Sequence, residues 1–392
     1  MLNGGENMQN VGVVFGGKSS EHDVSIITAI QTIEKLKIDQ FNIVPIYVTQ
    51  ENEMYIGKGL DKFSTYKNFS KKKLTQVCFT IGSNYLFKIN SKGTKTKSVI
   101  KLDFVYNCCH GGAGENGLMS AVFEMCNIPS SSGDYLSLGI CMDKVVAKYF
   151  FIANDLPVID FFAITKNDWI TNKNQVVQQL LNFKLPVIIK PARQGSSIGV
   201  CLANTLEEFV YGMQVALKFD NKVLIERAII EKTEFNCSVI RGENKIYASD
   251  IEEPENDKVV LSFEAKYLDN KNIKGNKGKM KVSSIGFDKL GIDQAKRKLP
   301  ANIDDKICAK IKKLSRLCYQ LLDLNGVIRI DYIYDTLNKK IYINEINAIP
   351  GSLAFYFWKK MDMFSNIYTA GKKYWTNRFV PEKYKSHIFD NL

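Results

Sequence analysis

The sequence INEINAIPGSLAFYFW, residues 343–358, begins with the pattern of a strand and then breaks at Pro350-Gly351. Side chains alternate between the two faces of a strand, so Glu345 and Asn347 point to the same face. One face of this strand therefore presents a carboxylate and an amide oxygen immediately before the break.

A second strand pattern lies upstream, in GVIRIDYIYD, residues 326–335. Arg329 and Asp331 stand two positions apart there, among the branched and aromatic residues that are typical of strands. The short segment TLNKK between the two stretches predicts a hairpin turn. Pairing of these strands would bring Asp331, Glu345 and Asn347 together, with Arg329 beside them.

This predicted cluster of oxygen-bearing side chains has two interpretations. Mg²⁺ takes carboxylate and carbonyl oxygens, usually with waters and substrate phosphates as its remaining ligands. The other interpretation is an amphipathic hairpin whose polar face lies in solvent. The hairpin alone does not decide between a metal site and a solvated face, so the rest of the chain must.

Composition limits the class of protein. The chain has 392 residues, 45% of them apolar and 24% charged, which is typical of a globular protein with two or three domains. No stretch approaches the roughly 18 consecutive apolar residues of a membrane-spanning helix, and the start lacks the basic and apolar regions of a signal peptide. We therefore expect a cytoplasmic protein with no membrane partner. The nine cysteines form no Cys-x-x-Cys pair, which argues against zinc and disulfides.

The net charge of +12 raises the alternative of a nucleic-acid-binding protein, because basic patches neutralise phosphates. The lysines, however, occur in scattered doublets and triplets, as at residues 71–73 and 372–373, without interleaved aromatic residues. We therefore expect no nucleic-acid partner. The densest basic run, residues 271–281, is expected to be a loop near phosphate.

Strand and helix patterns alternate from residue 11 to residue 48, which is typical of an open α/β sheet. Two glycine-rich turns, FGGKSSEH and HGGAGENG, each follow a strand, so we expect them side by side at the carboxyl edge of the sheet. His22 and His110 fall in these turns, and each is either structural or part of a site. Residues 50–100 are polar and lysine-rich with weak strand signals, and are predicted to form a peripheral extension.

The segment PVIIKPARQGSSIGV, residues 186–200, runs from a strand into a Gly-Ser-Ser turn and then into another strand. Lys190 supplies a point charge at the end of the first strand, and Ser196 and Ser197 supply backbone and hydroxyl donors. This combination is suited to binding phosphate. A plain hairpin turn would need neither the lysine nor the serines.

Taken in order, these segments resemble the D-alanine:D-alanine ligases of the ATP-grasp superfamily. The resemblance runs from Val11 to about Lys373 and rests on the collinear motifs GGKSSEHDVS, HGGAGENG, MDK, KPARQGSSIGV, EAKY, RID and NEINAIPG. It implies an α/β (α+β) ATP-grasp fold with three parts: an N-terminal open α/β substrate-binding domain (1–132), a central ATP-grasp subdomain (133–232) and a C-terminal catalytic domain (233–392).

The resemblance also implies an ATP-dependent ligase that joins two D-alanines through an acyl phosphate, giving D-alanyl-D-alanine for peptidoglycan synthesis. A pair of Mg²⁺ ions, replaceable by Mn²⁺, would be held by Asp331, Glu345 and Asn347. The other charged positions would bind ATP, the phosphates by Lys144, Lys190 and Lys266, the adenine by Glu226 and the ribose by Glu234.

The resemblance assigns catalysis to a further set of residues, Glu21, Ser196, Tyr267, Arg329 and Gly351. Glu21 would orient the amino group of the first D-amino acid and would be linked through Ser196 to Tyr267. Arg329 and the backbone of Gly351 would form the oxyanion site. A homodimer through the N-terminal region follows from the same analogy.

The second-substrate side departs from the family pattern. After Pro-Gly the family generally has small hydroxyl residues, whereas this chain reads SLAFYFW, with Ser352 the nearest hydroxyl and Tyr356 at about the position of the usual serine. These two residues, together with His110 in the first pocket, are the expected substrate-binding positions. The alternatives are therefore a D-alanine:D-alanine ligase, a related ligase with a changed acceptor, and a non-catalytic ATP-binding protein. The last of these is disfavoured because the chain retains the whole set of Arg329, Asp331, Glu345, Asn347, Lys190 and Lys266, and a protein that binds without turnover needs no oxyanion arginine.

Overall fold

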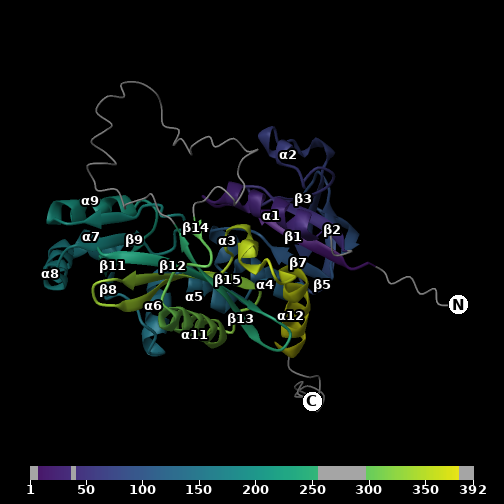
Figure 1. Cartoon of the computed structure of the whole chain (residues 1–392). Helices are drawn as coiled ribbons and strands as arrows, with labels where there is room; N and C mark the ends of the chain where they lie inside the picture. The colour runs from purple at the N-terminus through teal and green to yellow at the C-terminus, as the bar shows by residue number, and fades with distance from the viewer. Residues whose placement is uncertain (1–7, 37–40, 255–296, 379–392) are drawn as a thin grey trace, which may run out of the picture.

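The computed structural model describes residues 8–36, 41–254 and 297–378, so Lys266 and Tyr267 lie outside the described part of the chain. Its strands form three separate sheets of seven, four and five strands. In Figure 1 the seven-stranded sheet lies at one end of the molecule and the four-stranded sheet at the other, with the five-stranded sheet between them. The mixture of parallel and antiparallel sheets with helices agrees with the predicted α/β (α+β) class.

The first sheet has the strand order β6-β5-β4-β3-β2-β1-β7. Its parallel strands are β1 (Asn10–Gly16), β2 (Asn42–Val48) and β7 (Phe104–Asn107). Its antiparallel strands are β3 (Met54–Ile56), β4 (Thr75–Thr80), β5 (Ser83–Ile89) and β6 (Lys95–Lys101). Residues 50–100 therefore extend the sheet outward, as predicted, and they do so with a row of antiparallel strands.

Several helices accompany the first sheet: α1 (His22–Leu36), α2 (Phe63–Lys67), the 3₁₀ turn η1 (Lys71–Lys73), α3 (Gly112–Glu115) and α4 (Leu118–Met125). Helix α1 buries Ile26, Ile30 and Ile33, which recur at helical spacing, against the residues of β1. This packing fixes the loop between β1 and α1 at the carboxyl edge of the sheet.

The second sheet is antiparallel, with the order β10-β9-β11-β8. Its strands are β8 (Phe161–Thr165), β9 (Val187–Pro191), β10 (Cys201–Ala203) and β11 (Lys222–Arg227). The helices of this stretch of the chain are α5 (Tyr135–Met142), α6 (Lys144–Ala153), α7 (Lys166–Thr171), α8 (Lys173–Phe183) and α9 (Leu206–Ala216), of which α5 packs in the core of the third sheet. Phe209 and Met213 of α9 pack on Ile189 and Val223, so the sheet has its own core.

The third sheet has the order β14-β13-β12-β15-β16. Its strands are β12 (Lys232–Arg241), β13 (Ile246–Pro254), β14 (Arg297–Lys298), β15 (Val327–Asp335) and β16 (Lys340–Asn347). The remaining elements are α11 (Asp305–Leu321), the 3₁₀ segment η5 (Gly351–Trp358) and α12 (Met363–Arg378). Strands β15 and β16 pair antiparallel, which confirms the predicted hairpin.

The segment η5 contains three successive left-handed residues, Ser352, Leu353 and Ala354, with φ between 47° and 55°. A left-handed conformation costs about 1–2 kcal/mol for each L-residue, so tertiary contacts must hold this turn. The Ser352 N–H donates to Thr28 Oγ1 of α1 at 3.0 Å, and Leu353 and Ala354 pack in the core that α1 shares with β1. After the break at Pro350-Gly351, η5 thus packs against α1 and β1 of the N-terminal sheet.

The far end of η5 is anchored by a buried serine. Ser238 Oγ of β12 accepts from Trp358 Nε1 at 3.0 Å and donates to the Ile328 carbonyl at 2.9 Å. We expect Ser238→Ala to lower the free energy of unfolding by about 1–2 kcal/mol, because the indole N–H is left buried without an acceptor. Urea unfolding measures this loss. Ser98→Ala on the exposed strand β6 is the matched control and should unfold as the wild type does.

Candidate active site

The two glycine-rich turns lie side by side, as predicted, because β1 and β7 pair in parallel and end at the same edge of the sheet. His22, in the first turn, is buried and structural: its Nδ1 lies 2.7 Å from the Gly17 carbonyl and its Nε2 lies 3.0 Å from Tyr47 Oη. These two contacts hold the loop that carries Glu21 at the start of α1.

His110, in the second turn, connects the first sheet to η5. Its Nε2 lies 2.8 Å from Thr28 Oγ1, the same oxygen that accepts the Ser352 N–H, so one hydroxyl joins the second turn to η5. Burial lowers the pKa of His110 to about 4, and the charge of Arg329 adds to this effect. His110 is therefore a neutral, buried link, and its predicted role in lining a substrate pocket stays a prediction.

The neutral state of His110 makes the fold sensitive to acid. Because the folded pKa, about 4, lies below the ordinary value of 6.5, the contribution to stability is complete above pH 6.5 and is lost as the pH falls towards 4. We expect the wild type to lose roughly 3 kcal/mol more stability than His110→Gln between pH 7 and pH 4. Urea unfolding at each pH measures it. Parallel stability curves for the two proteins would contradict this assignment.

Glu21 and Ser196 meet as predicted, although 175 residues separate them: the Ser196 hydroxyl donates to Glu21 Oε1. Ser196 follows Gly195, where an added Cβ would lie 2.7 Å from Glu21 Oε2, so a side chain there would displace the carboxylate. The two segments come from the first turn and from the β9–β10 connection. Tyr267, the third member of the predicted set, lies outside the described residues.

The β15–β16 hairpin brings the predicted metal ligands together. Asp331 pairs in register with Glu345, and Arg329 pairs with Asn347. Asn347 Nδ2 donates to Asp331 Oδ2 at 2.9 Å, while the Arg329 guanidinium forks onto both Asp331 oxygens at 2.7 and 2.8 Å. Burial raises the pKa of Asp331 against the opposing charge of Arg329.

The donor set of this hairpin suits a hard divalent cation. The two carboxylates and the amide are oxygen donors, and Mg²⁺ commonly takes only a few protein oxygens and completes its shell with phosphates and waters. Within the described ranges, no group of three or more His, Cys, Asp or Glu side chains forms a closed metal cage. Three oxygen donors leave positions on a cation for phosphate oxygens and waters, so these residues fit a site that a phosphate substrate would complete.

The predicted phosphate lysines reach the same hairpin from the second sheet. Lys144 Nζ, at the start of α6, lies 3.3 Å from Glu345 Oε2 and donates to the Gln194 carbonyl at 2.7 Å. Burial raises the pKa of Glu345, but the charges of Lys144 and Lys190 outweigh it, so the net shift is downward. The charged carboxylate of Glu345 thus lies close to the ammonium groups of Lys144 and Lys190.

Lys190 is held by two partners, neither of which the sequence predicted. Its Nζ pairs with Glu226 of β11 and donates to Asn344 Oδ1 of β16 at 3.0 Å. Asn344 is the extra residue of a bulge, because Asp331 pairs with Glu345 while the next residue pairs with Ile343. The bulge turns this amide towards the lysine.

Lys148 of α6 is a residue that sequence reasoning missed. Its Nζ lies 3.0 Å from Glu226 Oε2, and both side chains are almost fully buried. The spacing of four residues from Lys144 could have revealed it, because residues i and i+4 share one face of a helix. Glu226 therefore lies between Lys148 and Lys190.

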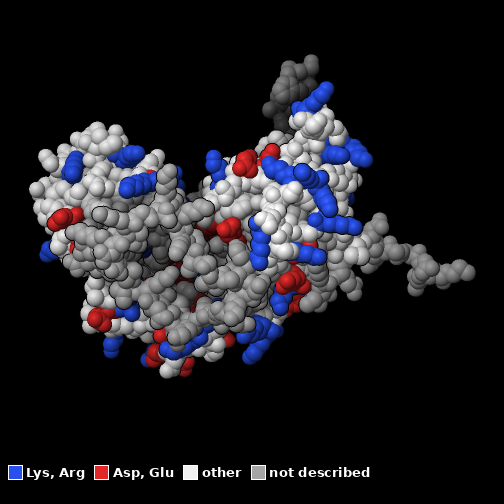
Figure 2. All heavy atoms as spheres, turned by 90° about the horizontal axis from the view of Figure 1, so that it is seen from above, with Lys and Arg blue, Asp and Glu red and all other residues white. Residues whose placement is uncertain are grey.

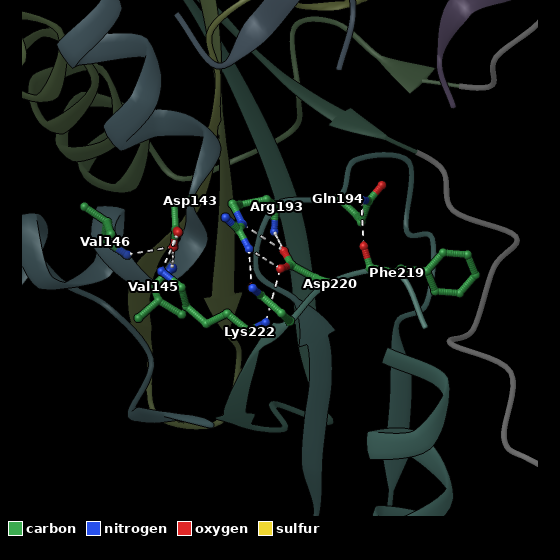
Figure 3. A network of polar contacts seen from close by, with 9 residues as sticks. Asp143, Val145, Val146, Arg193, Gln194, Phe219, Asp220 and Lys222 are labelled. Atoms are coloured by element: carbon green, nitrogen blue, oxygen red, sulfur yellow. Dashed lines mark hydrogen bonds and ion pairs between the residues drawn. The ribbon is translucent and has the colours of Figure 1, made fainter. Parts of the chain in front are cut away.

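A network around the β9–β10 connection holds the lysines in place (Figure 3). Asp143 caps α6 by accepting from the Val145 and Val146 N–H groups, and Lys222 of β11 pairs with it at 2.6 Å. Arg193 forks onto Asp220, just before β11. The start of α6 and the Gly-Ser-Ser turn are thereby tied to the same strand.

The remaining predicted positions lie around this centre. Glu234, at the start of β12, pairs with Lys232 at 2.6 Å and is partly exposed. Gly351 is exposed, and a Cβ at Gly351 would meet no atom within 4 Å, so its backbone is open to approach by a ligand. Ser352 is buried and uses its N–H for Thr28.

Tyr356 has partners that the sequence did not predict. Its hydroxyl donates to Glu252 Oε2 at 3.2 Å, and the Arg297 guanidinium lies 4.2 Å from its ring centroid. Burial, with the charge of Glu252, raises the pKa of Tyr356 to about 12, and Arg329 opposes the shift. The tyrosine is therefore a neutral hydroxyl near the predicted oxyanion arginine.

The surface shows how charge is distributed. On the face in Figure 2, Lys and Arg side chains form separate groups with acidic side chains between them.

None of the helices that the structure describes has both the length and the apolar character required to cross a membrane.

Comparison with known proteins supports the same interpretation as the geometry. The family model for the D-ala D-ala ligase N-terminus matches residues 10–132, and the model for the C-terminus matches residues 150–285 and 279–366. A D-alanine-D-alanine ligase of Thermosipho melanesiensis is 35% identical over 92% of this chain and 91% of its own length. One from Caldicellulosiruptor bescii is 29% identical over 91% of each chain.

Solved structures share the fold. A D-alanine-D-alanine ligase from Helicobacter pylori matches with a TM-score of 0.72 at 24% identity, over 93% of this chain and 98% of that one. A D-Ala:D-Ser ligase from Enterococcus faecalis matches with a TM-score of 0.69 at 23% identity, over 95% of this chain and 100% of that one. The fold is therefore the ATP-grasp fold of these enzymes. With two family models covering most of its length, the chain belongs to the D-alanine-D-alanine ligase family.

Proposed function

We propose that this protein is an ATP-dependent ligase that joins two D-alanine molecules to form D-alanyl-D-alanine for peptidoglycan synthesis. The observation that carries the proposal is the 3.3 Å contact between Lys144 and Glu345, because it joins a phosphate-binding lysine to the carboxylates that suit a divalent cation. The names of the relatives support the choice of substrate.

In the first step, a carboxylate oxygen of the first D-alanine attacks the γ-phosphorus of ATP, and ADP leaves. Lys144 and Lys190 bind the phosphates, while Glu21, held by Ser196, orients the amino group of the substrate. Asp331, Glu345 and Asn347 would hold a pair of Mg²⁺ ions. Such ions spread the negative charge of the transferred phosphoryl group.

In the second step, the amine nitrogen of the second D-alanine attacks the acyl carbon, the C–O bond to phosphate breaks, and one proton is released. The oxyanion that forms is stabilised by Arg329 and by the N–H of Gly351. Arg329 is fixed for this task by its fork onto Asp331, which also places it beside the cation site. Tyr267 and Lys266 are proposed to complete the site from outside the described residues.

The rest of the proposed assignment follows the same chemistry. The backbone at and after Glu226 would contact the adenine, because the carboxylate itself is buried, and Glu234 would contact the ribose. His110, Ser352 and Tyr356 would line the substrate pockets. The chain is proposed to divide into units 1–132, 133–232 and 233–392, which is supported by the three separate sheets. We place the reaction in the cytoplasm, where ATP is available, and propose a homodimer through the N-terminal sheet.

A second candidate is a ligase with a changed acceptor, and the contacts of Tyr356 favour it. The tyrosine hydroxyl and the Glu252 carboxylate form a polar pair near Arg329, where a small hydroxyl residue was expected. This half-buried pair presents other hydrogen-bonding groups than a small hydroxyl would, and a site discriminates between substrates through the polar groups that it presents.

The experiment is incubation with Mg-ATP and D-alanine, followed by phosphate release and mass spectrometry of the product. A product with the mass of D-alanyl-D-alanine is expected. The assay is then repeated with D-alanine mixed with other D- and L-amino acids or D-lactate. A mixed product in place of the dialanine would support the second candidate, and no product with any mixture would contradict both.

A further inference from the structure

Three charged side chains lie in a row that ends at Lys190, the lysine proposed to bind phosphate. Glu226 of β11 lies between Lys148 of α6 and Lys190 of β9, and the side chains of Lys148 and Glu226 are 1% and 2% exposed. Burial lowers the pKa of Lys148. Burial also acts to raise the pKa of Glu226, but the charges of Lys190 and Lys148 outweigh it and lower that pKa to about 2. Glu226 is therefore a buried carboxylate flanked by two ammonium groups.

The two lysines differ in what else they can reach. Lys190 is 12% exposed and also contacts Asn344, next to Glu345. The Lys148 side chain is closed off by burial at 1% exposure, and the Phe161 ring centroid lies 5.4 Å from its Nζ. Among the described residues, neither Lys148 Nζ nor Glu226 Oε2 has a hydrogen-bond partner outside this pair. Lys148 can thus act on a ligand only through Glu226.

Glu226 and a bound phosphate would compete for the Lys190 ammonium group. A lysine that binds phosphate must leave, or share, its carboxylate partner. A buried carboxylate that loses its only partner is strongly destabilised. With Lys148 on its other oxygen, Glu226 stays paired when Lys190 turns to phosphate. Without Lys148, Lys190 would be the one cationic partner of Glu226 described here, and this pairing would oppose the binding of Lys190 to phosphate.

We propose that Lys148 is a positioning residue that keeps Glu226 paired and so releases Lys190 to bind the phosphates of the nucleotide. The inference rests on the proposed function, in which Lys190 binds phosphate. It predicts a specific pattern. Loss of Lys148 weakens phosphate binding only while Glu226 is charged.

The test measures binding of inorganic tripolyphosphate with Mg²⁺ by titration calorimetry, because this probe lacks the adenine that Glu226 is proposed to contact. We expect Lys148→Met to weaken binding by about tenfold or more. The double variant Lys148→Met/Glu226→Gln should return to within about threefold of the wild type, and Lys148→Arg, which keeps the charge, should do the same. Lys173→Met, on the exposed face of α8, is the control and should bind as the wild type does.

Several results would overturn the inference. Wild-type affinity in Lys148→Met, or no recovery in the double variant, would show that Lys148 does not act through Glu226. If Lys148→Met fails to fold, Glu226→Gln is compared with the double variant: equal affinities are expected, and a weaker double variant would mean that Lys148 acts on phosphate directly. Lys190→Met separates the two proposals. An unchanged affinity there would contradict the phosphate role of Lys190 itself.

Discussion

Arg329→Ala is expected to lower the rate of dipeptide formation by about 10³-fold or more. Loss of one oxyanion donor commonly costs 10²–10³ in rate. Arg329 also forks onto both Asp331 oxygens, so its removal leaves a buried carboxylate without its main partner. The rate is measured by mass spectrometry of the product, and the first half-reaction is followed separately by isotope exchange within ATP.

The separation of the two steps tests the role of Arg329. We expect isotope exchange to fall much less than dipeptide formation, because the arginine stabilises the transition state of the second step. Arg316→Ala, on the exposed face of α11, is the matched control and should retain full activity. Dipeptide formation within tenfold of the wild-type rate would exclude Arg329 from the transition state.

Glu345→Gln is expected to lower kcat/KM by about 10³-fold at low Mg²⁺ concentration. The substitution keeps the shape of the side chain but removes a charged oxygen ligand, and even residues that only support metal ligands cost 10–100-fold when changed. The variant also takes from Lys144 its carboxylate partner at 3.3 Å. Activity is measured as a function of Mg²⁺ concentration.

The Mg²⁺ dependence is the decisive part of this measurement. We expect the concentration for half-maximal activity to rise by about 100-fold, with partial recovery at high Mg²⁺. Glu207→Gln, on the exposed first turn of α9, removes an equal charge and should leave the Mg²⁺ dependence unchanged. An unchanged dependence in Glu345→Gln would contradict its role as a metal ligand.

Some elements were visible in the sequence because their patterns are local. The alternation of residues 326–335 and 343–347 predicted the β15–β16 hairpin, and the predicted grouping of Asp331, Glu345 and Asn347 is confirmed by its register. The strand–turn–helix pattern at the start predicted two adjacent glycine-rich turns, and β1 and β7 confirm it. Helix α5 was missed, because its eight residues are apolar nearly all round and carry no clear helical period.

The backbone conformation of η5 could also not be predicted from the sequence. Nothing in SLAFYFW signals three left-handed residues, since L-residues adopt this conformation only where contacts hold it. Those contacts come from Thr28, more than 300 residues earlier in the chain. The hydrogen-bond partner of Tyr356 is Glu252, which likewise lies far away in the sequence, in strand β13.

The sequence by itself determined the hairpin, the two glycine-rich turns and the residue types of the site, because side-chain alternation and turn chemistry depend on neighbours along the chain. Only the tertiary structure decided that Ser196 meets Glu21, that the Asn344 bulge faces Lys190, and that Lys148 is buried against Glu226. These contacts arise where separate sheets and helices pack together. Their partners are set by packing and by the need to pair buried charges, which no local period encodes.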